Sequence, residues 1–164
     1  EILASHFPRL TSISRIECFD ASHTSITSVT VGMVTFIDGE PDKNLYRRFR
    51  IMNEKITDDL SFLEEALRRR FTHQNDWGMT DLLVIDGGKM QVGRAREVLR
   101  DLNLKTPVIG IVKPFDDLVI PHQEGFLIKR ARGSAQSLIQ RLRDEAHRFA
   151  KAYHIKLRDK KFLS

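Results

Sequence analysis

Alternating apolar and polar positions in the first fifty residues predict three β-strands. Residues 15–22 alternate around Phe19, residues 28–37 are rich in Val, Thr, Met and Phe, and residues 43–51 carry spaced apolar side chains. Asp38-Gly39 separates the second run from the third, and this dipeptide between two β-like segments is typical of a hairpin turn. The three strands are therefore expected to form an antiparallel meander.

The remainder of the chain alternates between helical and strand patterns. In chain order the expected elements are a helix at 57–71, a strand at 82–85, a helix at 92–102, a strand at 107–112, a small hairpin at 118–128 and a long amphipathic helix at 134–158. The wholly apolar run 82–85 is typical of a strand buried on both faces of a sheet. It is therefore expected to be the central strand.

This order of elements is that of the RNase H-like fold. Right-handed crossovers make the fourth and fifth strands parallel to the first. We therefore predict an α/β fold whose mixed five-stranded sheet, three antiparallel strands and then two parallel ones, is flanked by helices. A generic α/β domain could share the pattern and is the alternative.

Length and composition indicate one domain over residues 1–164, with 1–14 as an N-terminal lead-in and 154–164 as a basic tail. No apolar run is long enough to span a bilayer, and no secretory signal is visible. Cys18 is the only cysteine in the sequence, which excludes an internal disulfide framework and a cysteine-based zinc site. These features are typical of a cytoplasmic protein in a reducing compartment.

A modest excess of positive charge makes nucleic acid a reasonable partner. Lys and Arg number 27 against 22 Asp and Glu, which gives a net charge of +5. Basic residues cluster at 46–50, 68–70, 129–132 and 156–161. Each cluster could bind phosphates, or it could be an ordinary solvated surface. Because Arg47 and Arg48 are neighbours on a strand, they point to opposite faces, and at most one of them lines a given groove.

Two aspartates follow strands whose carboxyl ends are expected to share one edge of the sheet. Asp20 closes the first strand and Asp86 closes the fourth. If those strands are adjacent and parallel, the two carboxylates converge, and their repulsion favours a divalent cation such as Mg²⁺ or Mn²⁺ between them. The alternative is that each Asp ends a strand and caps a turn.

His147 lies at the margin of the apolar stripe of the last helix, beside the inward-facing positions Ala146 and Phe149. A helix packed across the sheet edge could bring His147 to the two aspartates as a metal ligand or as an acid near a phosphate. The alternative is a histidine of the surface or the core margin. Asp58 and Asp59 begin the first helix, where stabilisation of the helix dipole is a sufficient reason for both.

Five segments, taken in order, resemble the C-terminal endonuclease half of the UvrC family. They are residues 15–24, 46–49, 67–71, 83–89 with Gln91, and 141–150. The most specific are IDGGK, which begins at Ile85, and EAHRFA, which begins at Glu145. The resemblance implies a metal-dependent DNA endonuclease that makes the 5′ incision in UvrABC-type nucleotide excision repair. It implies damaged double-stranded DNA, UvrB and, indirectly, UvrA as partners.

The resemblance also implies roles for single residues. Asp20 corresponds to the family's first-strand carboxylate, Asp86 to its central one and His147 to its helix histidine. Asp59 corresponds to a further acidic position, with Asp58 as the neighbour that could be confused with it. These matches imply that Asp20, Asp59, Asp86 and His147 are catalytic. They also imply that Asp20, Asp86 and His147 bind Mg²⁺ or Mn²⁺.

By the same resemblance, Lys89 and Arg148 flank the metal site and contact DNA, with Arg47, Arg48 and Lys113 as secondary candidates. Two other classes of function remain open from the sequence. One is a non-catalytic RNase H-like module that binds DNA or a protein. The other is a nuclease of another RNase H-like lineage that acts on RNA or on deaminated bases.

Overall fold

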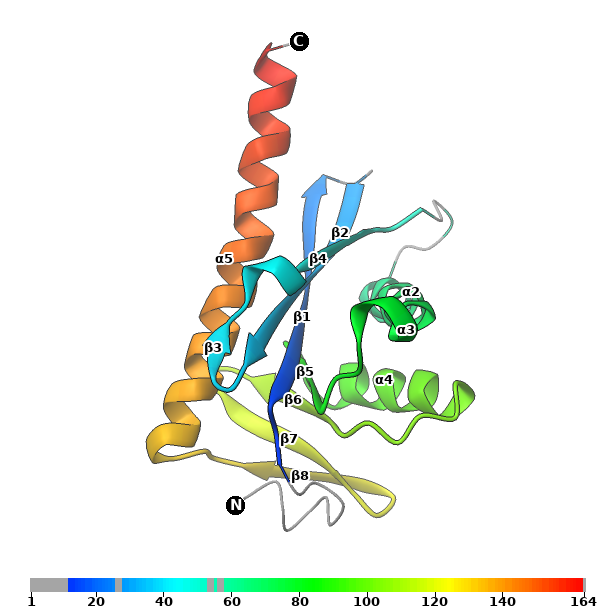
Figure 1. Ribbon diagram of the computed structural model, residues 1–164, viewed down its shortest axis with the longest axis vertical. Coiled ribbons are helices and arrows are strands. Elements are labelled where there is room, and N and C mark those ends of the chain that lie inside the picture. The colour runs from blue at the N-terminus through cyan, green and yellow to red at the C-terminus, as the bar shows by residue number, and fades with distance from the viewer. Residues whose placement is uncertain (1–11, 26–27, 53–54, 56–57, 164) are drawn as a thin grey trace.

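The computed structural model describes residues 12–25, 28–52, 55 and 58–163. The strands are β1 (Arg15–Ser25), β2 (Ser28–Ile37), β3 (Glu40–Pro41), β4 (Arg47–Arg50), β5 (Leu82–Ile85), β6 (Val108–Val112), β7 (Asp117–His122) and β8 (Gly125–Lys129). The helices are η1 (Lys43–Leu45), α2 (Asp59–Thr72), α3 (Gln74–Trp77), α4 (Lys89–Asp101) and α5 (Gly133–Leu163) (Figure 1). In these residues the strands form one sheet of order β3-β2-β1-β5-β6-β7-β8, with β4 paired to β2.

Strand pairing confirms the expected centre of the sheet. β1 and β2 are antiparallel, whereas β1, β5 and β6 are parallel neighbours. The sheet is wider than the five strands expected, because the hairpin predicted at 118–128 joins it through antiparallel pairing of β7 with β6. Only part of the third strand expected at 43–51 is a strand, because residues 43–45 form η1 and residues 47–50 form β4. The Asp42 side chain accepts a hydrogen bond from the Asn44 N–H and caps η1, so that strand pairing resumes at β4.

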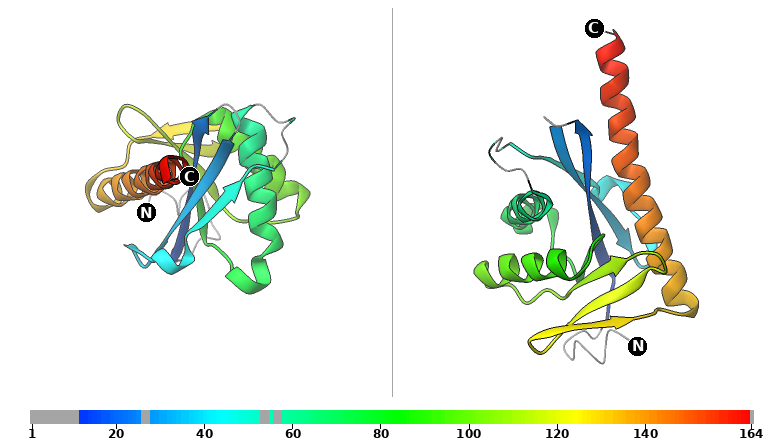
Figure 2. Two further views of the ribbon diagram at one scale, coloured as in Figure 1. Left: turned by 90° about the horizontal axis from the view of Figure 1, so that it is seen from above. Right: turned by 180° about the vertical axis from the view of Figure 1, so that it is seen from behind.

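Helices cover the sheet on both faces. α5 packs on one face, and α2 and α4 pack on the other (Figures 1 and 2). Successive residues of β1 and β5 point to opposite faces, as the pleat of a strand requires. Cys18 and Val84 are buried beneath α5, and Phe19 and Leu83 are buried beneath α2 and α4. β5 is buried along its whole length, which confirms its prediction as the central strand.

The ends of two helices differ from the expected ones. Asp58 is the N-cap of α2, and its side chain accepts a hydrogen bond of 2.9 Å from the Ser61 N–H. Thr57, where this helix was expected to begin, lies outside the described residues. α5 continues to Leu163, so the described part of the expected basic tail is helical and extends past the sheet (Figure 1). None of the described helices has the length and hydropathy needed to cross a membrane.

A buried ion pair joins β1 to α2. The Arg70 guanidinium donates hydrogen bonds of 2.7 and 2.8 Å to the two carboxylate oxygens of Glu17, and both side chains are fully buried. Arg15 donates a further hydrogen bond of 2.8 Å to Glu17. Arg70 also donates to the Gly78 carbonyl, and Arg15 donates to the Trp77 carbonyl. The cluster therefore anchors the segment after α2 to the first strand.

Replacing Arg70 by Met is expected to lower the free energy of unfolding by about 3 kcal/mol, because the buried Glu17 carboxyl group then keeps only the hydrogen bond from Arg15 and loses the two from Arg70. Urea denaturation measures the change. Arg68→Met is the matched control, because Arg68 pairs with Asp101 at 2.7 Å on the surface. Such an exposed pair is worth about 0–1 kcal/mol. Equal losses in the two variants would contradict a special role for the buried pair.

Candidate active site

The carboxyl ends of β1 and β5 bring Asp20 and Asp86 to the same edge of the sheet. The Asp86 N–H donates a hydrogen bond of 3.0 Å to the carbonyl of Phe19, the residue before Asp20. Asp20 follows Cys18 by two residues and Asp86 follows Val84 by two, so strand alternation puts both aspartates on the α5 face. The parallel pairing of β1 with β5 therefore brings Asp20 and Asp86 to one edge of the sheet, as the sequence predicted.

The two carboxylates lie in a partly buried environment. Burial, and after it the charge of Asp86, raises the pKa of Asp20 from 3.8 to about 7, against the opposing charge of Lys113. Burial also raises the pKa of Asp86, against the charges of Lys113 and His147. A carboxylate is held above its normal pKa when solvent and neighbouring cations do not stabilise its charge. Burial therefore outweighs the charges of the nearby cations at both carboxylates.

α5 places His147 over this edge. The Nδ1 atom of His147 lies 3.7 Å from Oδ2 of Asp20. The His147 side chain is 54% exposed, whereas that of Asp20 is 12% exposed. The separation is too long for a direct hydrogen bond, and it exceeds the roughly 3.0 Å between adjacent ligands of an octahedral ion with bonds of about 2.1 Å, so the side chains would have to rotate to bind one ion. The half-exposed ring can therefore face both the buried carboxylate and a ligand in solvent.

Two charged residues that the sequence did not single out also belong to this edge. Asp116 lies in the turn between β6 and β7, and its carboxylate accepts a hydrogen bond from Arg143 of α5. The charge of Arg143 lowers the pKa of Asp86, and the charge of Asp116 raises it. Arg143 precedes His147 by four residues and so shares its helix face. Helical spacing could have identified Arg143, but Asp116 gives no comparable signal in the sequence.

The carboxylates and His147 form an open group rather than a closed cage. Among the described residues, no three side chains of His, Cys, Asp or Glu stand close enough together to hold a metal ion. The types of donor nevertheless suit a hard divalent cation, since carboxylate oxygens and a histidine nitrogen share one edge of the sheet. The residues present are thus chemically compatible with Mg²⁺ or Mn²⁺.

Asp59 is placed differently from the other predicted catalytic residues. It is exposed in the first turn of α2, the helix that packs on the face opposite α5. Its neighbour Asp58 caps that helix, and hydrogen bonds from Ser61 lower the pKa of Asp58. The structure therefore brings Asp20, Asp86 and His147 to one edge without Asp59 as a third close carboxylate. Its catalytic role stays a prediction.

Of the predicted DNA-binding residues, Lys113 and Lys89 lie next to this edge, whereas Arg148 is paired with Glu145. Lys113 follows β6 and is exposed, and its charge acts on both Asp20 and Asp86. Lys89 is the first residue of α4 and is also exposed. Arg148 is 53% exposed, but its Nε donates a hydrogen bond of 2.8 Å to Glu145. Lys113 is therefore the cation most directly linked to the two aspartates.

Arg47 and Arg48 point to opposite faces of the sheet, as expected. The Arg48 guanidinium lies 3.7 Å from the centre of the Phe149 ring, on the α5 side, and donates to the Phe149 carbonyl. The Arg47 guanidinium lies 4.7 Å from the centre of the Trp77 ring, on the side of α2 and α3. Both guanidiniums are therefore packed on aromatic rings.

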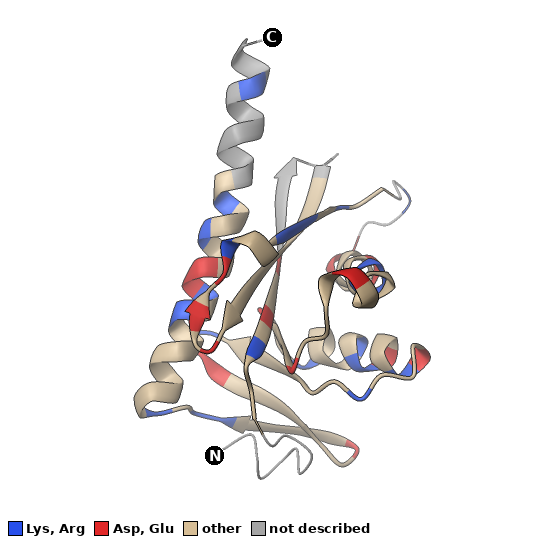
Figure 3. Cartoon of the chain, viewed as in Figure 1, with Lys and Arg blue, Asp and Glu red and all other residues tan. Residues whose placement is uncertain are grey.

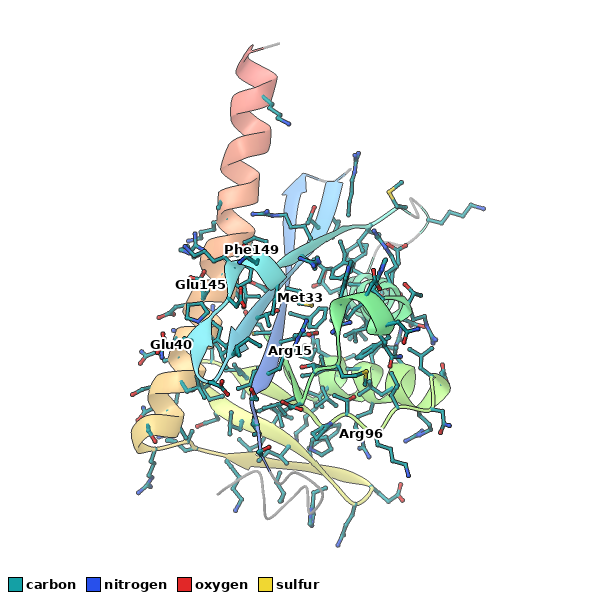
Figure 4. All side chains as sticks on the ribbon, viewed as in Figure 1. Arg15, Met33, Glu40, Arg96, Glu145 and Phe149 are labelled. Carbon is teal, nitrogen blue, oxygen red and sulfur yellow. The ribbon has the colours of Figure 1, made fainter. Side chains whose placement is uncertain are left out.

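Gly32 lets α5 approach the sheet beside Asp20. In β2 it is paired with Asp20 on one side and with Arg48 of β4 on the other. A Cβ atom at Gly32 would lie 3.2 Å from Cδ1 of Phe149. Phe149 is labelled in Figure 4. Because Phe149 is two residues from His147, this contact sets how closely α5 can hold the histidine to Asp20.

The sheet order and the acidic edge define an RNase H-like α/β protein. Its fold is similar to that of endonuclease V from Ciona intestinalis, crystallised with an inosine-containing 24mer DNA, with a TM-score of 0.57. The match covers 90% of this chain and 88% of that one, at 9% sequence identity. The similarity therefore concerns the fold alone.

The sequence identifies the family. The family described as the UvrC RNase H endonuclease domain matches residues 6–150. The UvrABC system protein C of Prosthecochloris aestuarii is 43% identical over 151 residues, which cover 91% of this chain and 24% of that protein. The protein of the same name from Methanosarcina acetivorans is 40% identical over 158 residues, 95% of this chain and 30% of that protein. The chain therefore belongs to the UvrC RNase H endonuclease domain family, and it spans about a quarter of the length of these relatives.

Proposed function

We propose that this chain is a metal-dependent DNA endonuclease domain that makes the 5′ incision in UvrABC-type nucleotide excision repair. The observation that carries the proposal is the meeting of Asp20 and Asp86 at adjacent parallel strand ends, with His147 of α5 3.7 Å from Asp20. Membership of the UvrC endonuclease family supports it. In this proposal the substrate is damaged double-stranded DNA, with UvrB and, indirectly, UvrA as partners.

Asp20, Asp86 and His147 would hold Mg²⁺ or Mn²⁺, with Asp59 in a supporting role. When bound, the divalent cation supplies activation of the attacking water and stabilisation of the departing 3′ oxygen. Asp20 and Asp86 provide the negative charge that attracts the cation, and rotation of their side chains on a fixed backbone would close the group. His147 is placed either to complete the ligand set or to donate a proton near the phosphate.

The surrounding cations would bind the DNA backbone. Lys113 is the cation whose charge acts most strongly on Asp20 and Asp86, and it would contact the phosphate next to the cut. Lys89 and Arg148 would contact neighbouring phosphates. Arg47 and Arg48 are packed on Trp77 and Phe149, so their contribution would be weaker. These contacts position a strand without reading its sequence.

The proposal is tested by incubating the chain, together with UvrA and UvrB, with end-labelled duplex DNA that carries a single bulky lesion, in Mn²⁺, Mg²⁺, Ca²⁺ or EDTA. We expect incision on the 5′ side of the lesion with Mn²⁺ or Mg²⁺, and no incision with EDTA. An undamaged duplex and an RNA duplex are the matched substrates. Incision in EDTA, or cleavage of RNA in preference to DNA, would contradict the proposal.

Gly32→Ala is expected to lower the incision rate roughly three- to tenfold, because the added methyl group pushes Phe149, and with it His147, away from Asp20. Single-turnover incision in Mn²⁺ measures the effect. Gly125→Ala is the control, because a Cβ at Gly125 would meet nothing closer than 4.0 Å. A Gly32→Ala rate equal to that of the control would show that this contact does not set the catalytic geometry.

A further inference from the structure

α4 carries a row of basic residues that begins at the proposed active site. Lys89, Arg96 and Arg100 are separated by 7 and 4 residues, with Gly93 between the first two. At about 100° per residue these four positions lie within about 60° of one another around the helix axis. A Cβ at Gly93 would lie 3.8 Å from Cζ of Phe126, so the row faces the β7–β8 hairpin. Arg96 is labelled on α4 in Figure 4, and Figure 3 marks the Lys and Arg positions of α4.

The row leads into a pocket at the far end of α4. The pocket has a volume of about 390 Å³ and lies between α4, the loop to β6 and the β7–β8 turn. Arg96, Arg100, Lys105 and His122 supply its basic groups, and Leu104 is among its apolar ones. A volume of this size is within the range of sites that bind small ligands or single units of a polymer.

Ion pairing distinguishes the arginines and the lysine of this pocket from the arginines on the α2 side of α4. On the α2 side, Arg94 pairs with Glu64 at 2.7 Å, and Arg68 pairs with Asp101 at 2.7 Å. In the part of the chain that the structure describes, Arg96, Arg100 and Lys105 take part in no such pair. Arg100 lies in the last turn of α4 and stabilises the helix dipole, but Arg96 and Lys105 lie outside that turn.

We propose that Lys89, Arg96, Arg100 and Lys105, called here the α4 row, bind the phosphate backbone of duplex DNA on one flank of the incision. This inference rests on the proposed endonuclease function. α4 has 13 residues and is therefore about 20 Å long, which corresponds to about six base pairs of duplex. The α4 row starts at the catalytic edge and has several cations along its length. It therefore suits a polymer with regularly spaced negative charges that leaves this edge, rather than a single acidic side chain of a peptide.

The test compares duplex binding by the whole chain and by two double variants that each lose two cations. Arg96→Gln/Arg100→Gln removes part of the α4 row. Arg68→Gln/Arg69→Gln removes two arginines of α2, both of which have acidic partners. Fluorescence anisotropy with a duplex of about 24 base pairs is recorded in Ca²⁺ over a range of salt concentrations. We expect the α4 variant to bind at least about tenfold more weakly, with a salt slope smaller by about two.

Equal affinity and slope for the wild type and the α4 variant would overturn the inference, as would an equal loss in the α2 variant. Poly-glutamate that binds the wild type but not the α4 variant, while duplex binding stays unchanged, would assign the pocket to an acidic protein segment instead. Arg100→Gln/Lys105→Gln, at two exposed positions, repeats the test if the first variant is unstable. Binding is measured in Ca²⁺ and does not require incision. If the wild type binds the duplex through the α4 row but never incises it, that result contradicts the proposed function and leaves the inference about the α4 row intact.

Discussion

Asp20→Asn is expected to abolish metal-dependent incision, by about 10³-fold or more, while making the metal-free protein more stable. The substitution removes one of the two charged carboxylates that would bind the cation, and a bound cation contributes several kcal/mol to stabilisation of the transition state. The same substitution removes a charge that the metal-free fold holds in a partly buried place, beside Asp86. Activity and stability are therefore expected to change in opposite directions.

The effect on stability depends on pH in a defined way. The pKa of Asp20 is raised from 3.8 to about 7 in the folded chain, so folding takes up a proton between these values. The favourable contribution of protonated Asp20 is complete below pH about 4 and is lost as the pH rises through about 7. The gain from Asn should therefore be largest above pH 7 and vanish near pH 4. In the wild type at subsaturating Mn²⁺, incision should fall as the pH drops below about 7, because protons then compete with the cation for Asp20.

Thermal melts in EDTA at pH 5 and pH 8, together with incision assays in Mn²⁺, measure the two effects. Asp76→Asn is the matched control, because Asp76 is exposed on α3 and pairs with His73, away from the catalytic edge. It should leave incision unchanged. Retained incision by Asp20→Asn, or a lower melting temperature than the wild type at pH 8, would contradict the role assigned to Asp20.

His147→Ala is expected to lower the rate of incision by about 10²- to 10³-fold, the range typical of a lost proton donor or a lost metal ligand. Lys151→Ala is the control, because Lys151 is exposed on the same helix, four residues further along. If the two variants incise at the same rate, the placement of His147 beside Asp20 has no catalytic meaning.

A Mn²⁺ titration of His147→Ala separates the two roles that the geometry allows. A ligand role predicts weaker Mn²⁺ binding, with a rate that is partly restored at high Mn²⁺ concentration. A proton-donor role predicts unchanged Mn²⁺ binding and loss of the alkaline limb of the pH–rate profile. The 3.7 Å separation from Asp20 and the 54% exposure of the ring are compatible with both.

Local patterns were sufficient to predict the elements that carry the site. The apolar run of β5 and the alternation of β1 are properties of contiguous residues, and the right-handed crossover rule makes these strands parallel. The position of Asp20 beside Asp86 follows from these two facts. Pairing at the edges of the sheet depends on distant segments, so the sequence did not predict that β7 would extend the sheet beside β6.

The rest of the site depends on tertiary packing that leaves no periodic pattern. Arg143 gains its role from Asp116, which lies in a turn on another element. Gly32 matters because the Phe149 ring rests on it. The sequence pattern alone could not separate Asp58 from Asp59, whereas the structure gives Asp58 the capping bond of α2. The sequence can therefore predict that side chains at the ends of adjacent parallel strands lie together. Contacts that depend on packing between distant elements are seen only in the structure.

The most direct test of the account is a crystal of the chain soaked in Mn²⁺ and measured for anomalous scattering. We predict a peak about 2.0–2.2 Å from carboxylate oxygens of both Asp20 and Asp86, and near the imidazole of His147. A peak at another surface, or no peak while Asp20, Asp86 and His147 stay as they are in the metal-free chain, would contradict the claim that these side chains hold the cation.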